Sequence, residues 1–128
     1  MAEYNYSGKF NPPAPVLELS ISAPLSTESA SSLGLVDSGA DITVLPEQVI
    51  SQLKIRRVDF ALVSGFGKDI VEVPVYSATL NMRGILKPQI YRVLSWDEDY
   101  TLIGRDLLNK LVAILNGPQA KLNLKLPK

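Results

Sequence analysis

Apolar and polar residues alternate along most of this 128-residue chain, and the alternation predicts β-strands. VLELSIS at 16–22 and DIVEVPVYSATLNM at 69–82 mostly alternate, which is typical of half-buried strands. Pro74, within the second of these, cannot donate a ladder hydrogen bond, so we expect a sheet edge or a β-bulge there. The same reasoning predicts further strands or strand pairs at 33–36, 56–64, 85–95 (interrupted by Pro88) and 112–126.

Turns and short helices complete the predicted elements. The small polar segment 24–32 predicts a loop within a hairpin at 16–36, and GFGK at 65–68 predicts the turn of a second, long hairpin. LPEQVISQL at 45–53 has a proline and an acid in its first turn and one apolar face, which predicts a short helix. A second helical pattern follows Gly104. Together these elements predict an all-β domain with two short helices.

The first 15 residues differ from the rest of the chain. Prolines at 12, 13 and 15 oppose a helix and favour extended backbone. We therefore expect an exposed N-terminal arm at 1–15 and a single domain at 16–128, a length that suits one hydrophobic core. The aromatic residues Tyr4, Tyr6 and Phe10 indicate that part of the arm packs, either on a partner or on the same domain.

Composition narrows the chemistry. Thirteen basic and 13 acidic residues give zero net charge, so we expect no nucleic-acid partner. The chain contains no Cys and no His, which excludes disulfides, thiolate nucleophiles, His-dependent triads and His/Cys zinc sites. Any hydrolysis must use carboxylates, hydroxyls, lysines or an oxygen-ligated metal. No long apolar run and no apolar N-terminal stretch occur, so we expect no membrane partner and a cytoplasmic location.

The stretch LVDSGADITVLP at 35–46 stands out because a strand-like apolar run ends in a carboxylate. Burial of Asp37 would be costly unless its carboxylate accepts hydrogen bonds. Gly39 allows a sharp turn and a close backbone approach, while Ser38 can donate and accept locally. Taken alone, the tripeptide is most simply an aspartate in a turn.

The run LGLVDSGADITVLP and the later TLIGRDLL together resemble the retropepsin-like aspartic protease family, which includes retroviral and retrotransposon-type proteases and their cellular and prokaryotic relatives. In that family an apolar strand leads into Asp-Ser/Thr-Gly-Ala, a glycine-bearing flap hairpin follows, and a Gly-Arg-Asp-like motif precedes a short helix. The three parts occur here in that order, and the likeness covers nearly the whole chain from Val16. The resemblance implies an all-β, retropepsin-like acid protease fold: a small closed β-barrel-like domain with a flap hairpin and one or two short helices.

The resemblance also assigns roles within an active-site loop. Asp37 matches the catalytic aspartate of the family, and Ser38, Gly39 and Ala40 match the rest of its loop. The Ser38 hydroxyl would bond to its twin in a second subunit and brace the two loops. The Gly39 carbonyl would help to position the substrate.

Two further roles follow from the resemblance. Asp41 would bind the substrate backbone and pair with Arg105; this is either an ordinary surface ion pair or, as we favour, a partly buried one that supports the loop. Gly65, Phe66 and Gly67 would form the flap tip and bind substrate. Phe66 could equally be a simple exposed turn residue.

A single Asp-Ser-Gly motif in the chain predicts a homodimer. Aspartic protease chemistry uses two carboxylates that share one proton, one activating a water and the other polarising the scissile carbonyl. A two-fold axis would supply the second Asp37. The resemblance thus implies a homodimeric aspartic endopeptidase that binds an extended peptide and needs no cofactor or metal. The alternatives are a non-catalytic dimeric peptide-binding module, which need not keep the acid, and a carboxylate-pair glycosidase, for which the chain is short.

Two remaining patterns have simple structural interpretations. Leu122, Leu124 and Leu126 alternate with polar residues and predict a core-facing strand, which also suits the interdigitated terminal sheet of the family's dimers. WDEDY at 96–100 contains three acids, but a solvated turn explains it better than a metal-binding loop.

Overall fold

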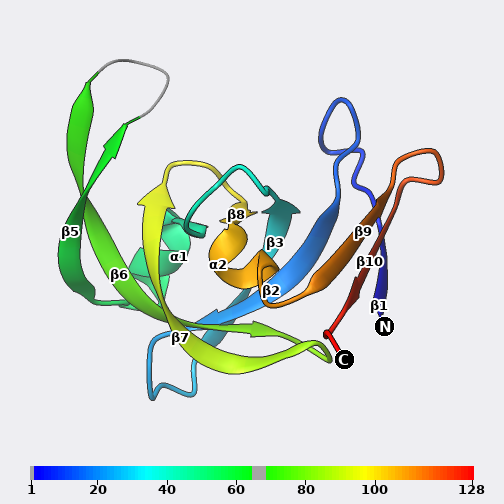
Figure 1. Ribbon diagram of the computed structural model, residues 1–128. Coiled ribbons are helices and arrows are strands. Elements are labelled where there is room, and N and C mark those ends of the chain that lie inside the picture. The colour runs from blue at the N-terminus through cyan, green and yellow to red at the C-terminus, as the bar shows by residue number, and fades with distance from the viewer. Residues whose placement is uncertain (1, 65–68) are drawn as a thin grey trace.

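The computed structural model describes residues 2–64 and 69–128, and within them the chain is mostly β-structure, as predicted (Figure 1). The strands are β1 Ala2–Asn5, β2 Val16–Ser22, β3 Ser29–Val36, β4 Val44–Pro46, β5 Arg57–Ser64, β6 Ile70–Met82, β7 Leu86–Trp96, β8 Thr101–Ile103, β9 Val112–Asn116 and β10 Lys121–Lys125. The helices are α1 Glu47–Gln52 and α2 Arg105–Leu108. Both predicted helices are therefore present, each shorter than its apolar pattern.

A closed barrel forms the body of the molecule. Seven strands lie in the order β2-β3-β8-β4-β7-β6-β5, and an additional pairing of β2 with β6 closes the first six into a ring. The β3–β8 and β4–β7 pairs are parallel, and the other neighbours in the ring are antiparallel. The expected small closed barrel is confirmed.

Alternation along the strands builds the core. On β2, Leu17, Leu19 and Ile21 are buried while Glu18 between them is exposed, because successive side chains point to opposite faces of the sheet. The largest fully buried side chains come from the barrel strands and the segment before β4, from α2, and from β10 of a second sheet. They are Leu19, Ile21, Leu45, Leu80, Met82, Val93, Ile103, Leu107, Leu122 and Leu124, with the polar Thr43 and Thr101 among them.

The long hairpin forms from β5 and β6 and projects from the barrel (Figure 1, green). Pairing of β6 with β7 begins only at Tyr76, so Pro74 has a neighbouring strand, β5, on one side only. The expected sheet edge at Pro74 is thus confirmed. Pro88 lies beside a register shift between Leu80 and Met82, where its missing N–H costs no ladder bond.

The first hairpin differs from its prediction at the loop. Strand β3 begins at Ser29, and Ser29–Ser32 pair with β2, so the connecting loop is shorter than the predicted 24–32. Small polar residues suit this strand because one of them, Ser32, is buried and shares a 2.7 Å hydrogen bond between its hydroxyl and that of Thr101. The polar composition of the segment concealed this internal pairing.

The two chain ends form a separate three-stranded antiparallel sheet in the order β1-β10-β9. The first residues of the predicted arm are therefore a strand, and Tyr4 and Tyr6 pack against the core of the same chain. Leu122 and Leu124 are fully buried, as expected of a core-facing strand, whereas Leu126 lies beyond β10 and is 54% exposed. In the single chain β1 and β9 occupy the two edges of β10, and the fit of this strand to an interdigitated dimer sheet stays a prediction.

Candidate active site

Asp37 lies where two parallel strands end side by side. Val36 of β3 pairs with Ile103 of β8, and the Asp37 N–H continues the ladder by donating to the Ile103 carbonyl at 3.0 Å. Gly34 allows this close packing, because a Cβ there would lie 2.5 Å from Ile103 Cδ1. The ends of the two strands thus fix where the aspartate enters the loop.

The turn after Asp37 holds its partly buried carboxylate. The Gly39 N–H donates to Asp37 Oδ1 at 2.8 Å, and the Ala40 N–H donates to the Asp37 carbonyl at 3.2 Å. Ser38 and Gly39 are both exposed at the tip of this turn. The carboxylate therefore has the hydrogen-bond donor that its sequence context required, while it stays open to solvent on the other side.

Arg105, at the start of α2, binds the Asp37 loop with both its backbone and its side chain. Its N–H donates to the Ala40 carbonyl at 2.8 Å, its Nη1 donates to the Ser38 carbonyl at 2.8 Å, and its Nη2 bonds Asp41 Oδ1. The predicted ion pair exists. The expected partial burial holds only for Arg105, whose side chain is 41% exposed, because Asp41 sits at the loop surface with its side chain 85% exposed.

A second set of bonds, centred on the buried Thr43, was not predicted. The Thr43 hydroxyl donates to Asp106 Oδ1 at 2.7 Å and accepts the Gly104 N–H at 3.1 Å, and the Thr43 N–H donates to Asp106 Oδ2 at 3.0 Å. A Cβ on Gly104 would lie 2.7 Å from the Ile42 carbonyl carbon. The motif Gly104-Arg105-Asp106 could have indicated this network, but from the sequence only Arg105 was assigned a partner in the loop.

A cleft of about 390 Å³ lies between the loop and the hairpin. Loop residues form one side and the end of β5 forms the other, and this size falls within the range of ligand-binding pockets, ~300–1,000 Å³. Its lining is Gly39, Ala40, Asp41, Ile42, Val44, Leu62, Val63 and Ser64. The predicted flap-tip residues Gly65, Phe66 and Gly67 fall outside the described residues, so their roles stay predictions.

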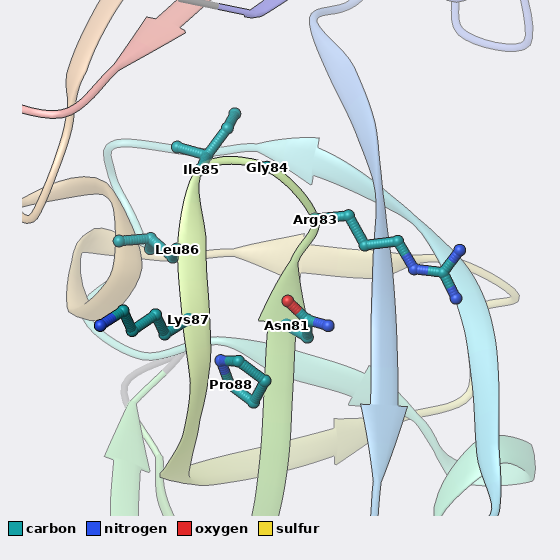
Figure 2. Close-up of a pocket in the computed structure, with 7 residues that line it drawn as sticks. All are labelled: Asn81, Arg83, Gly84, Ile85, Leu86, Lys87 and Pro88. Carbon is teal, nitrogen blue, oxygen red and sulfur yellow. The ribbon is translucent and has the colours of Figure 1, made fainter.

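Another hollow, of about 340 Å³, lies at the turn between β6 and β7 (Figure 2). Its cations do not converge: Arg83 extends toward β2 and β3, where it also lines a second hollow beside Glu18, whereas Lys87 points the other way (Figure 2). None of the residues that line this hollow carries a carboxylate. This hollow therefore offers no acid for catalysis.

The acidic turn 96–100 is tied to the N-terminal arm. Asp99 forms an ion pair with Lys9 at 3.0 Å, and the Tyr100 ring packs edge-on against both Phe10 and Trp96. Burial, reinforced by Glu98 and Asp99, raises the pKa of the Tyr100 hydroxyl. Across residues 2–64 and 69–128 no group of three or more acids has the spacing of a metal site, and none of their helices is long and apolar enough to cross a membrane.

Comparison with known proteins identifies the family of this chain. The model of the retroviral aspartyl protease family matches residues 12–116, which include the Asp37 loop, the hairpin and the Gly-Arg-Asp motif. The chain belongs to this family. It is a retropepsin-like chain, as the two motifs indicated, and β1 and β10 lie outside the matched region. No curated protein sequence gives a significant match.

Solved structures of retropepsin-like proteases resemble the fold. The EIAV protease complexed with the inhibitor HBY-793 is 26% identical, with a TM-score of 0.53, over 75% of this chain and 86% of that one. The simian foamy virus (mac) protease is 24% identical, with a TM-score of 0.55, over 74% of this chain and 92% of that one. A retropepsin-like aspartic protease from Rickettsia conorii is 14% identical, with a TM-score of 0.58, over 96% and 90%. The last two show the shared fold alone.

Proposed function

We propose that this protein is a homodimeric aspartic endopeptidase, in which two Asp37 carboxylates, one from each subunit, activate a water that attacks a peptide bond. The observation that carries the proposal is the Asp37 carboxylate, which accepts the Gly39 N–H in a loop bonded at three points to Arg105. Membership of an aspartic protease family supports the same assignment.

The chemistry requires the two carboxylates to share one proton. Close like charges oppose double ionisation, so one carboxylate stays ionised and removes a proton from water while the protonated one donates to the scissile carbonyl. Attack of the water gives a tetrahedral diol, and its collapse transfers a proton to the leaving amine. The Gly39 N–H keeps the carboxylate in one orientation throughout.

The substrate in this proposal is an extended peptide lying in the cleft between the loop and the hairpin. Exposed backbone at Gly39 and Asp41 and the edge of β5 can pair with such a peptide as one strand pairs with another. Ile42, Val44 and Leu62 line the cleft, so apolar side chains beside the cut bond fit best. The Ser38 hydroxyl would bond to its twin, and Gly65, Phe66 and Gly67 would cover the peptide.

The test compares three proteins on a mixed peptide library at acidic and neutral pH: the native chain, Asp37→Asn and Asp97→Asn. Asp97→Asn is the matched control, since it makes the same chemical change at an exposed acid outside the cleft. We expect cleavage by the native and Asp97→Asn proteins and none by Asp37→Asn, with activity falling in alkali as both carboxylates ionise. Cleavage by Asp37→Asn would refute the assignment. Peptide binding without cleavage by the native protein would instead establish the non-catalytic module.

A further inference from the structure

Residues 6–15 of the N-terminal arm form a loop between β1 and β2 (Figure 1, blue), which we call the arm loop. Two backbone hydrogen bonds close it, because Ser7 and Ala14 each donate an N–H to the carbonyl of the other, at 2.8 and 3.2 Å. The match to the family begins at residue 12, so the first half of the arm loop lies outside it. The arm loop therefore has a defined place in the fold for which membership of the family assigns no role.

The tip of the arm loop packs on the acidic turn that precedes β8. The Phe10 ring meets the Tyr100 ring edge-on, with 5.0 Å between their centroids. Lys9 lies over the same ring, and its Nζ pairs with Asp99. On its other side the Tyr100 ring meets Trp96, whose indole N–H donates to the Tyr100 carbonyl at 2.7 Å. Edge-on aromatic pairs attract beyond the area that they bury, whereas an exposed ion pair contributes little, so Phe10 is the main contact of the arm loop with this turn.

Two backbone connections lead from the arm loop to Asp37. Tyr100 is followed directly by β8, whose last residue, Ile103, accepts the Asp37 N–H with its carbonyl at 3.0 Å. The end of the arm loop reaches the other edge of β3, because the Pro15 carbonyl accepts the Val36 N–H at 3.0 Å. The strand that carries Asp37 thus ends between β8 and the arm loop, and the arm loop also holds the turn before β8.

We propose that the arm loop is a positioning element for Asp37 and that Phe10 is the residue through which it acts. This inference rests on the proposed function, in which each Asp37 must lie at a fixed distance from the second one. A misplacement of about 1 Å, even from a change far from the reacting atoms, can cost on the order of 100-fold in rate. Among the described residues that line the cleft, none belongs to the arm loop, so its loss should slow the reaction without weakening peptide binding.

The test compares Phe10→Ala with two controls, Phe10→Tyr and Ile85→Ala. Phe10→Tyr keeps the ring. Ile85 is only 9% exposed and lies in the turn between β6 and β7, outside the cleft, so Ile85→Ala should lower the melting temperature at least as much as Phe10→Ala does (Figure 2). We expect Phe10→Ala to lower kcat about 10- to 100-fold with KM unchanged, while both controls keep the native kcat. Rates at several protein concentrations separate this loss from a weaker dimer.

The pH dependence of kcat gives a readout that a loss of stability alone would not move. Two carboxylates held close together titrate at separated pKa values, because like charges oppose double ionisation. If the two Asp37 side chains move apart in Phe10→Ala, these pKa values approach each other and the pH range of activity becomes narrower. Ile85→Ala should keep the native range.

Hydrogen exchange tests the arm loop without any measurement of activity. The Val36 and Asp37 amides should exchange faster in Phe10→Ala than in the native and Ile85→Ala proteins, because the two bonds that hold the end of β3 would open more often. Melting curves check that each variant is folded. Phe10→Leu, with the same expected directions, takes the place of a Phe10→Ala protein that does not fold.

Three outcomes would overturn the positioning role. They are equal losses of kcat in Phe10→Ala and Ile85→Ala, a Phe10→Ala protein with native kcat and native exchange, and a raised KM at native kcat, which would mean that the arm loop acts on the peptide. If the native protein cleaves no peptide, the proposed function fails instead. Faster exchange at Val36 and Asp37 in Phe10→Ala would then still uphold the connection between the arm loop and the end of β3.

Discussion

The two walls of the cleft are held in different ways. Side chains from α2 bond the loop from Asp37 to Thr43. Arg105 bonds its exposed part at Ser38 and Asp41, and Asp106 bonds its buried end at Thr43. In its described residues the β5–β6 hairpin is held by its backbone ladder, by the ion pair of Asp59 with Arg92 of β7, and by Arg57 over the Phe60 ring. Its apolar side chains face solvent, with Leu62 at 72% and Ile70 at 68% exposed.

This difference fits two separate tasks. A carboxylate that must keep a fixed position needs hydrogen-bond partners that cannot shift, and the loop obtains them from a buried threonine and a helix start. A wall that covers a ligand needs accessible apolar area, which the hairpin keeps by leaving Leu62 and Ile70 uncovered. Changes in the loop should therefore reduce both folding stability and activity, whereas changes in the hairpin ladder should cost little stability.

The largest effect is expected from Gly104→Ala. Its backbone angles suit any residue, with φ −92°, but the new methyl would lie 2.7 Å and 2.9 Å from the Ile42 carbonyl carbon and oxygen and 3.0 Å from the Ala40 carbonyl oxygen. These are backbone atoms, so relief requires the Asp37 loop to move. We expect a loss of about 3 kcal/mol in the free energy of unfolding, or roughly 10 °C in melting temperature, and a loss of peptidase activity.

Two glycines serve as controls for that change. Gly117→Ala, where no atom lies within 4 Å of the added Cβ, should leave melting and activity unchanged. Gly34→Ala meets the buried Ile103 side chain at 2.5 Å (Cδ1) and 2.8 Å (Cγ1), atoms that can move more than backbone atoms, and should fall between the two. If Gly104→Ala melted with the native protein, the loop would not be held as closely as its contacts indicate.

The next largest effect is expected from Thr43→Val, which keeps the shape of a buried side chain and removes its hydroxyl. The Asp106 carboxylate would lose a donor and the Gly104 N–H its acceptor, so we expect a cost of about 1–3 kcal/mol by chemical denaturation. Thr43→Ser keeps the hydroxyl and should recover most of the lost stability. If Thr43→Ser were as unstable as Thr43→Val, packing of the methyl group, and not the hydrogen bonds, would explain the loss of stability.

The sequence predicted the fold well because most of its strands bury one face. Period-two alternation identifies β2, β6 and β10 directly, and glycine turns locate the hairpins between strands. The prediction placed the start of β3 too late, because Ser29–Ser32 lack the apolar alternation that marks a strand. These residues pair with β2, and the Ser32 hydroxyl bonds that of Thr101. β1 was missed because its pairing with β10 joins the two ends of the chain, which no local pattern shows.

The candidate site was predictable to the extent that its chemistry is carried by contiguous residues. Asp37 and Gly39 are neighbours, and the turn between them explains the 2.8 Å bond without any distant contact. The bonds of Thr43 to Asp106 and Gly104 join segments about 60 residues apart, and a lone threonine in an apolar run gives no sign of its partners. The exposure of Asp41 also depends on how the loop projects, which alternation does not encode.

The smallest effect is expected from Asp59→Asn on the hairpin. The Arg92 guanidinium, followed by the Phe60 N–H, lowers the pKa of the Asp59 carboxyl below its ordinary value of 3.8. A carboxyl with a lowered pKa in the folded protein stabilises it above the unfolded value, and this contribution disappears as the pH falls through the folded value. Both side chains are more than half exposed, so solvent screens the pair.

Near neutral pH, Asp59→Asn should therefore melt slightly below the native protein, by less than Thr43→Val does. The gap should close in acid well below pH 3.8, where the native carboxyl is protonated too. Melting curves across this range, with Asp97→Asn as the control for loss of an exposed acid, measure it directly. A gap that persists in acid would mean that Asp59 acts through packing, and a gap larger than that of Thr43→Val would reverse the contrast between loop and hairpin.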